Sequence, residues 1–139
     1  MRIFFDTSAL YKRYAEEVGR DTVVQLGQDA REVLVAAHCL TEVASALNRQ
    51  RHDGFVPQAD YARIMADIYA DFADFTIVNL DRRVEALSIA AMEAVRLRAM
   101  EALHVGTAQS ARADLFVTAD RRQATAAQAV GLKTRLIEA

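Results

Sequence analysis

Short apolar runs alternate with segments of helical period along this chain. The apolar runs predict strands at about residues 2–5, 33–37, 75–78, 115–118 and 133–137. The helical periods predict helices at about residues 8–14, 18–29, 40–51, 57–72, 84–95, 100–111 and 122–130. Strands that alternate with helices are typical of βαβ units, so the pattern predicts an α/β fold around a parallel sheet.

Turn and capping residues support these boundaries. Gly54 suits the position just after a helix, and Pro57 suits the first turn of the next one. Asp81 is placed to cap the helix that follows it, and Gly131 ends the last helix. The sequence has no repeat, low-complexity segment or linker, so we expect one domain over residues 1–139.

Composition places the chain among ordinary globular proteins. Its 139 residues are 53% hydrophobic and 26% charged. No apolar run approaches the roughly 20 residues of a membrane helix, and no signal peptide follows Met1. The single cysteine, Cys39, lies among apolar residues and is expected to be a small buried hydrophobe. Together these features predict a cytoplasmic protein.

The net charge of −2 gives no overall attraction to nucleic acid, so any such contact must depend on local Lys and Arg. The three histidines, His38, His52 and His104, are far apart in the sequence, and no zinc-binding spacing is visible.

Four acids lie at or one turn beyond predicted strand–helix junctions: Asp6, Glu42, Glu101 and Asp120. Each has a structural alternative. Asp6 and Asp120 can cap helices, Glu42 can be a solvated charge, and Glu101 can complement a helix dipole. His104 is open to two interpretations, a base one turn after Glu101 or a packing residue.

The carboxyl ends of parallel strands meet at one edge of a sheet, which is where ligands bind in such folds. Carboxylates gathered there repel one another unless a cation or raised pKa values compensate. Several oxygen ligands select Mg²⁺ or Mn²⁺ over zinc, so the four acids predict a site for one of these hard cations.

Four segments, taken in order, resemble the motifs of PIN-domain ribonucleases, and most of all the VapC-type toxins of toxin–antitoxin modules. They are Phe4-Phe5-Asp6-Thr7-Ser8-Ala9-Leu10, Leu40-Thr41-Glu42-Val43-Ala44-Ser45-Ala46-Leu47, Glu101-Ala102-Leu103-His104-Val105 and Phe116-Val117-Thr118-Ala119-Asp120. The resemblance spans essentially the whole chain. It implies three α/β/α layers with a central parallel sheet of about four to five strands. It also implies Mg²⁺- or Mn²⁺-dependent hydrolysis of RNA by Asp6, Glu42, Glu101 and Asp120.

The chain departs from the family at one position. The third motif usually begins with Asp, and this chain has Glu101. The extra methylene moves the carboxylate by about 1 Å, and misplacement on that scale can lower a rate about 100-fold. A binding or regulatory module with a weakened site is therefore the alternative to a nuclease. A phosphotransfer enzyme of the haloacid-dehalogenase kind is disfavoured, because Ser8 stands where that family needs a second Asp.

Smaller roles fall to residues beside these motifs. Thr7, Ser8 and Thr118 are candidates to orient a ligand carboxylate or a water. The cations nearest the first and last motifs, and so the candidates to contact RNA phosphates, are Lys12, Arg13, Arg121 and Arg122.

Apolar residues around 55–72 exceed what a small sheet needs: Phe55, Tyr61, Ile64, Ile68, Tyr69 and Phe72. One interpretation is intramolecular core. The other follows from the resemblance, which implies a homodimer whose hydrophobic groove receives a segment of a cognate antitoxin.

Overall fold

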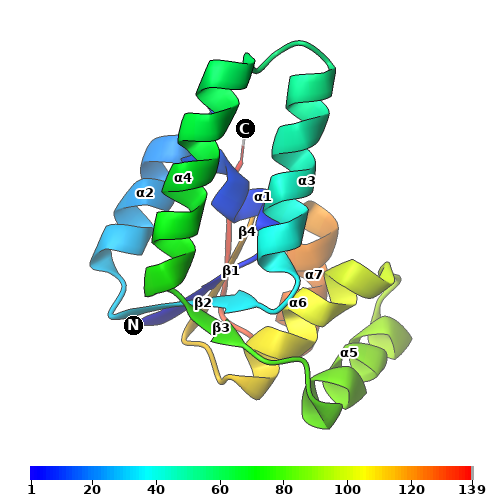
Figure 1. Ribbon diagram of the computed structural model, residues 1–139. Helices are drawn as coiled ribbons and strands as arrows, with labels where there is room; N and C mark the ends of the chain where they lie inside the picture. The colour runs from blue at the N-terminus through cyan, green and yellow to red at the C-terminus, as the bar shows by residue number, and fades with distance from the viewer. Residues whose placement is uncertain (139) are drawn as a thin grey trace.

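The protein folds around a five-stranded parallel sheet, seen in a computed structural model that describes residues 1–138. The strands are β1 (Arg2–Phe5), β2 (Glu32–Ala36), β3 (Thr76–Val78), β4 (Leu115–Thr118) and β5 (Thr134–Leu136). Their spatial order is β3-β2-β1-β4-β5, and every neighbouring pair is parallel (Figure 1). The α/β fold with a central parallel sheet is confirmed.

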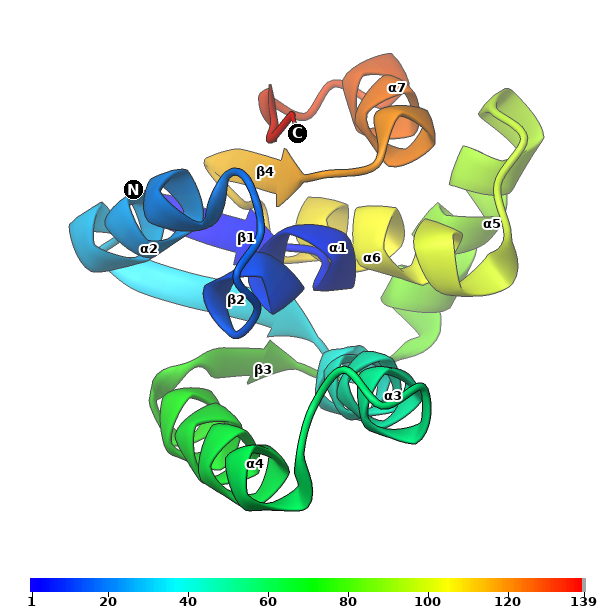
Figure 2. The same cartoon turned by 90° about the horizontal axis from the view of Figure 1, so that it is seen from above.

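Seven α-helices and one 3₁₀ turn connect the strands within the described residues. They are α1 (Thr7–Leu10), the 3₁₀ turn η1 (Tyr11–Arg13), α2 (Arg20–Asp29), α3 (Cys39–His52), α4 (Gln58–Asp74), α5 (Arg82–Ala94), α6 (Ala99–Ser110) and α7 (Arg121–Ala129). The long helices α3 and α4 lie side by side, as Figures 1 and 2 both show. No helix within residues 1–138 has the length and apolarity needed to cross a membrane.

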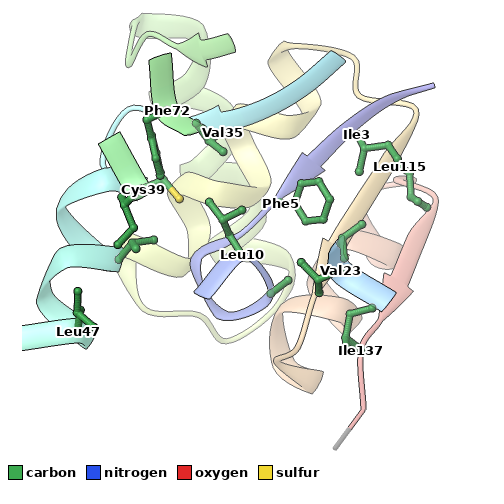
Figure 3. Close-up of a cluster of buried hydrophobic side chains, with 14 of the residues drawn as sticks. Ile3, Phe5, Leu10, Val23, Val35, Cys39, Leu47, Phe72, Leu115 and Ile137 are labelled. Carbon is green, nitrogen blue, oxygen red and sulfur yellow. The ribbon is translucent and has the colours of Figure 1, made fainter. Parts of the chain in front are cut away.

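Alternation of side chains along the buried strands produces two cores, one on each face of the sheet. In β1, Ile3 and Phe5 point to a core built with α1 to α4, and Figure 3 shows this cluster. Phe4 points to the opposite core, where it meets Phe116 of β4 and the small residues of α6 and α7. A sheet covered on both faces gives the expected three layers.

Most boundaries lie within one or two residues of the sequence expectation, and two of the differences have a clear structural cause. The first helical segment divides into α1 and the tighter turn η1. The helix expected from about residue 18 begins at Arg20, because Gly19 adopts a left-handed φ of 95° and so cannot continue a right-handed helix. The caps agree with expectation: the carboxylate of Asp81 accepts from the Val84 amide, and Gly54 follows α3 at a φ of 85°.

The apolar stripe of α4 separates into core and surface. Ile68 and Phe72 are buried against the sheet, whereas Phe55 and Tyr69 are 75% and 60% exposed. Intramolecular packing therefore accounts for only part of the apolar excess around residues 55–72.

Gly106 marks the closest approach between α5 and α6. A Cβ atom at this position would lie 2.7 Å from the Ser88 nitrogen and 2.9 Å from the Val84 carbonyl oxygen, both backbone atoms of α5. We expect Gly106→Ala to destabilise the protein by about 1–3 kcal/mol, because the two helices must separate. Urea unfolding measures the change.

Gly27→Ala is the matched control. Gly27 also lies within a helix, but its nearest neighbour, the Arg13 side chain, would be 3.4 Å from the new Cβ. This substitution should leave stability unchanged or raise it by up to about 1 kcal/mol through helix propensity. Equal effects at the two glycines would show that α5 and α6 do not pack closely at Gly106.

Candidate functional site

Three of the four acids follow strands that are neighbours in the sheet. Asp6 directly follows β1 and caps α1, and Asp120 follows β4 and caps α7. Glu42 lies in the first turn of α3, just beyond β2. Because β2, β1 and β4 are adjacent and parallel, their carboxyl ends bring these acids to one edge of the sheet.

The Asp6 carboxylate is fully buried and accepts three hydrogen bonds. Its Oδ1 accepts from the Ala9 amide at 2.9 Å and the Ser8 hydroxyl at 2.8 Å, and its Oδ2 accepts from the Thr118 hydroxyl. Burial raises the pKa of Asp6, and the charge of His104 and these hydrogen bonds offset burial only in part. A buried carboxylate of this kind gains from a nearby cation.

Thr118 connects Asp6 to Asp120. The same hydroxyl oxygen that donates to Asp6 accepts the Asp120 backbone N–H at 3.0 Å. The Ser8 hydroxyl oxygen accepts the Ala119 N–H at 2.9 Å and reinforces the link. Asp120 uses Oδ1 to cap α7, accepting from the amides of Arg122 and Gln123 at 2.8 and 3.3 Å.

Glu42 lies on the other side of Asp6 and is held by Thr7 and His104. Its Oε1 accepts from the Thr7 hydroxyl and lies at the same 2.6 Å distance from His104 Nε2. Because an ionised carboxylate only accepts hydrogen bonds, this contact assigns a proton to Nε2 of His104. Burial acts to raise the pKa of Glu42, but the hydrogen bonds from His104 and Thr7 outweigh it and hold the pKa below its ordinary value.

Glu101 has a different contact. Its Oε1 accepts the Arg98 backbone N–H at 2.9 Å, so the side chain caps the start of α6. Asp6 and Asp120 are thus joined through Thr118, Glu42 adjoins Asp6 through Thr7, and Glu101 bonds to its own helix.

Two histidines complete the neighbourhood of Glu42. His38 Nε2 lies 3.4 Å from Glu42 Oε1, and the rings of His38 and His104 are 4.3 Å apart. Within residues 1–138, these three form the only group of three potential metal ligands whose atoms lie within 4.8 Å of one another. The cluster could hold a metal ion.

The sequence did not reveal this cluster, because its histidines are distant along the chain. The available signal was the four-residue spacing between His38 and Glu42, which places both side chains on one face of a helix. Burial and repulsion by His104 lower the pKa of His38, against the attraction of Glu42. His104 is almost fully buried and hydrogen-bonds to Glu42, so it is more than a packing residue.

The four candidate phosphate-binding cations fall into two groups. Lys12 is buried, with its ammonium 3.3 Å from a Glu17 oxygen and 3.0 Å from the Val18 carbonyl. Arg13 pairs with Asp71 at 2.8 Å. Arg121 and Arg122 are exposed beside Asp120, and Arg121 makes an open ion pair with Glu138.

Cys39 is buried, and its sulfur lies 3.7 Å from the Thr7 hydroxyl oxygen, whose proton is donated to Glu42. Burial raises the pKa of its thiol to about 12. The expectation that Cys39 is a small buried hydrophobe is confirmed, since the residue lies within the core.

Comparison with known proteins identifies the family. Residues 3–129 match the model of the PIN domain. A comparison with curated proteins gives no match. Among solved structures, Mycobacterium tuberculosis VapC20, described as a sarcin-ricin-loop-cleaving toxin, is 15% identical with a TM-score of 0.69, covering 94% of this chain and 95% of that one.

Two further structures have similar folds. A toxin–antitoxin complex from Klebsiella pneumoniae is 16% identical with a TM-score of 0.67, covering 87% of this chain and 88% of that one. FitAcB from Neisseria gonorrhoeae is 13% identical with a TM-score of 0.67, covering 95% of each chain. At these levels of identity the similarity shows a shared fold, and the family match covers most of the chain. The protein therefore belongs to the PIN domain family.

Proposed function

We propose that this PIN-domain protein is a metal-dependent endoribonuclease that acts as the toxin of a toxin–antitoxin pair in the cytoplasm. The observation that carries the proposal is the link between the Asp6 and Asp120 motifs, made by the Thr118 hydroxyl at the ends of adjacent strands. Asp6 and Asp120 follow rigid strands, and Glu42 of α3 lies beside them. This arrangement suits a hydrolytic site at the carboxyl ends of the strands, where ligands bind in parallel sheets.

The ligand chemistry of the four acids suits Mg²⁺ or Mn²⁺, and an ion would have to draw them together, because no three of their carboxylates lie within 4.8 Å of one another in residues 1–138. Asp6, Asp120, Glu42 and Glu101 offer carboxylate oxygens, which are the ligands these hard ions prefer. The buried Asp6 carboxylate has a raised pKa and would be compensated by the ion's charge. When bound, the metal activates a water and stabilises charge on the phosphate.

The protein's own groups would prepare this chemistry. Thr118 and Ser8 fix the orientation of the Asp6 carboxylate through hydrogen bonds, and Thr7 does the same for Glu42. Arg121 and Arg122 are exposed just after Asp120 and would contact phosphates of a bound RNA. Lys12 and Arg13 are engaged in internal ion pairs and would contribute less.

A second candidate function is a PIN-like binding or regulatory module with weak catalysis. The observation that favours it is the contact of Glu101 with the Arg98 amide, which directs this carboxylate to its own helix. The two candidates agree on the fold and on partner binding, and they differ in metal-dependent turnover.

An antitoxin and a second copy of the chain are the proposed protein partners. A groove beside α3 and α4 is lined by aromatic and apolar residues such as Tyr11, Phe55 and Ile64, and also by charged residues such as Glu16 and Arg63. Aromatic residues such as the exposed Phe55 are enriched at protein interfaces, and one of the similar structures is a toxin–antitoxin complex. A monomer by light scattering at micromolar concentration would count against the homodimer.

Calorimetric titration with Mn²⁺ tests the metal site without knowledge of the RNA target. We expect saturable binding in the wild-type protein and none in Asp6→Asn. An RNA cleavage assay with Glu101→Asp then separates the two candidates. A gain in cleavage rate of up to about 100-fold in the variant is expected if the longer Glu101 side chain limits catalysis, and it would support the weakly catalytic module. An unchanged rate would mean that Glu101 already serves the nuclease. Absence of Mn²⁺ binding in the wild-type protein would reject the nuclease proposal.

A further inference from the structure

Beside the carboxylates, one cluster presents nitrogen ligands. Nε2 of His38, Nε2 of His104 and Oε1 of Glu42 all lie within 4.8 Å of one another. His104 Nε2 is 2.6 Å from Glu42 Oε1, and His38 Nε2 is 3.4 Å from the same oxygen. We propose that these three side chains form a second metal site, selective for Zn²⁺ or a similar transition-metal ion.

The spacing suits tetrahedral coordination. With Zn–N and Zn–O bonds of about 2.0–2.1 Å, ligand atoms lie about 3.3 Å apart. The His38–Glu42 separation already has this value, and the His104–Glu42 pair must open by less than about 1 Å. His38 and Glu42 lie one turn apart at the start of α3. His38 Nε2 also lies 3.1 Å from the Met100 carbonyl oxygen, and a bound ion must replace this contact.

Ligand chemistry separates this site from the carboxylate site. Imidazole nitrogens favour zinc, copper, nickel and iron, whereas carboxylates and water favour magnesium and manganese. Two of the three ligands here are imidazoles, so Zn²⁺ is preferred over Mg²⁺. A three-residue set leaves the fourth tetrahedral position for water.

The surroundings allow a metal to approach and be held. The His38 and Glu42 side chains are 20% and 32% exposed, which opens one side of the cluster to solvent. Thr7 donates to Glu42 Oε1 and leaves that oxygen a second lone pair for the metal. All polar contacts of the buried His104 ring are made by Nε2, and its Nδ1 has no hydrogen-bond partner. A bound ion would displace the proton from Nε2, and the neutral ring would then carry its proton on Nδ1.

The lack of a hydrogen-bond partner for His104 Nδ1 limits the expected affinity for Zn²⁺. Zinc-bound histidines usually donate their other N–H to an acceptor, and loss of that contact weakens binding about 10–100-fold. We therefore expect Zn²⁺ to bind more weakly than at a site whose histidines are fully hydrogen-bonded, as suits a regulatory ion more than a permanent structural one.

Glu42 belongs to both sets of ligands. A Zn²⁺ ion that engages its Oε1 would compete with the use of Glu42 beside Asp6, so Zn²⁺ should inhibit Mn²⁺-dependent cleavage. This consequence rests on the proposed nuclease function, whereas Zn²⁺ binding itself does not.

Competition titration with a chromophoric zinc chelator tests the site in the full-length chain. His38→Asn is the diagnostic variant, because Asn is also a favourable helix N-cap and His38 occupies the N-cap of α3. His52→Asn is the matched control, since His52 lies exposed at the far end of the same helix. We expect one equivalent of Zn²⁺ in the wild type and in His52→Asn, and at least about 100-fold weaker binding in His38→Asn.

Two further measurements keep the outcomes distinct. Bound Co²⁺ should give the visible absorption bands of a tetrahedral site in the wild type and lose them in His38→Asn. Mn²⁺ binding should persist in His38→Asn and disappear in Asp6→Asn, while Zn²⁺ binding survives the latter. A wild-type protein that binds Zn²⁺ but not Mn²⁺ would reject the proposed nuclease function and support the zinc site. Zn²⁺ binding that is absent in the wild type, or equally tight in His38→Asn, would overturn the zinc site.

Discussion

Asp6→Asn should make the metal-free protein more stable and at the same time abolish its stabilisation by Mn²⁺. The carboxylate of Asp6 is fully buried, and burial is the largest influence on its raised pKa. Ionised Asp6 therefore opposes folding at neutral pH. Asn removes the charge, keeps an acceptor for Ala9 and Ser8, and presents an amide donor to the Thr118 oxygen.

The stability gained by Asp6→Asn should depend on pH. Because the pKa of Asp6 is raised in the folded state, the folded protein binds more protons than the unfolded chain just above the ordinary value of 3.8. Its contribution to stability is thus most favourable at low pH and falls as pH rises through the folded-state pKa. The advantage of Asp6→Asn should grow over that window and then level off. Glu42 has a lowered pKa and acts in the opposite sense in both proteins, so the comparison isolates Asp6.

Thermal unfolding in EDTA and in Mn²⁺ measures both halves of the prediction. In EDTA at neutral pH, the variant should melt a few degrees above the wild type. At Mn²⁺ concentrations 100 times the dissociation constant, binding stabilises the wild type by about 2.7 kcal/mol. For a domain of this size that raises the Tm by roughly 5–10 °C, and the variant should show no such rise. A variant that is less stable than the wild type at every pH would mean that hydrogen bonds to the carboxylate outweigh its burial.

Asp6 could be predicted from the sequence because of its position directly after a buried strand. A carboxylate directly after the apolar run Ile3-Phe4-Phe5 is costly to bury, and the strand pattern alone places it at a ligand-binding edge. Asp120 follows β4 in the same way. Parallel strands covered on both faces appear as continuous apolar runs, which is why β1 and β4 were located with their correct boundaries.

Contacts between distant segments could not be predicted in the same way. His38 and His104 meet only because β2 and α6 pack together, and no local period encodes that contact. Lys12 resembled a surface cation, but the tight turn η1 and the segment to Val18 fold over its ammonium. The site residues assigned from the sequence remain a prediction, and the metal titrations with Mn²⁺ and Zn²⁺ test them.

Phe116→Ala should destabilise the protein more than Gly106→Ala or any substitution of a proposed metal ligand. Phe116 lies at the centre of β4, which pairs with both β1 and β5, and its side chain is fully buried. Its ring stacks on Phe4 with centroids 5.4 Å apart and planes 8° from parallel. Truncation of a buried Phe to Ala removes this contact, leaves a cavity and costs about 3–5 kcal/mol.

Phe55→Ala provides the control, because Phe55 is 75% exposed and its loss should change stability by less than about 0.5 kcal/mol. Urea unfolding at low temperature measures both variants, since a loss of 3–5 kcal/mol is a large fraction of the roughly 5–15 kcal/mol that stabilises a typical domain. The effect also reaches the site, because β4 carries Thr118 at its end and Asp120 just beyond. A fall in Mn²⁺ affinity is therefore expected in Phe116→Ala even where it remains folded, and not in Phe55→Ala. Similar unfolding midpoints for the two variants would contradict the central position of Phe116 in the core that supports Asp6 and Asp120.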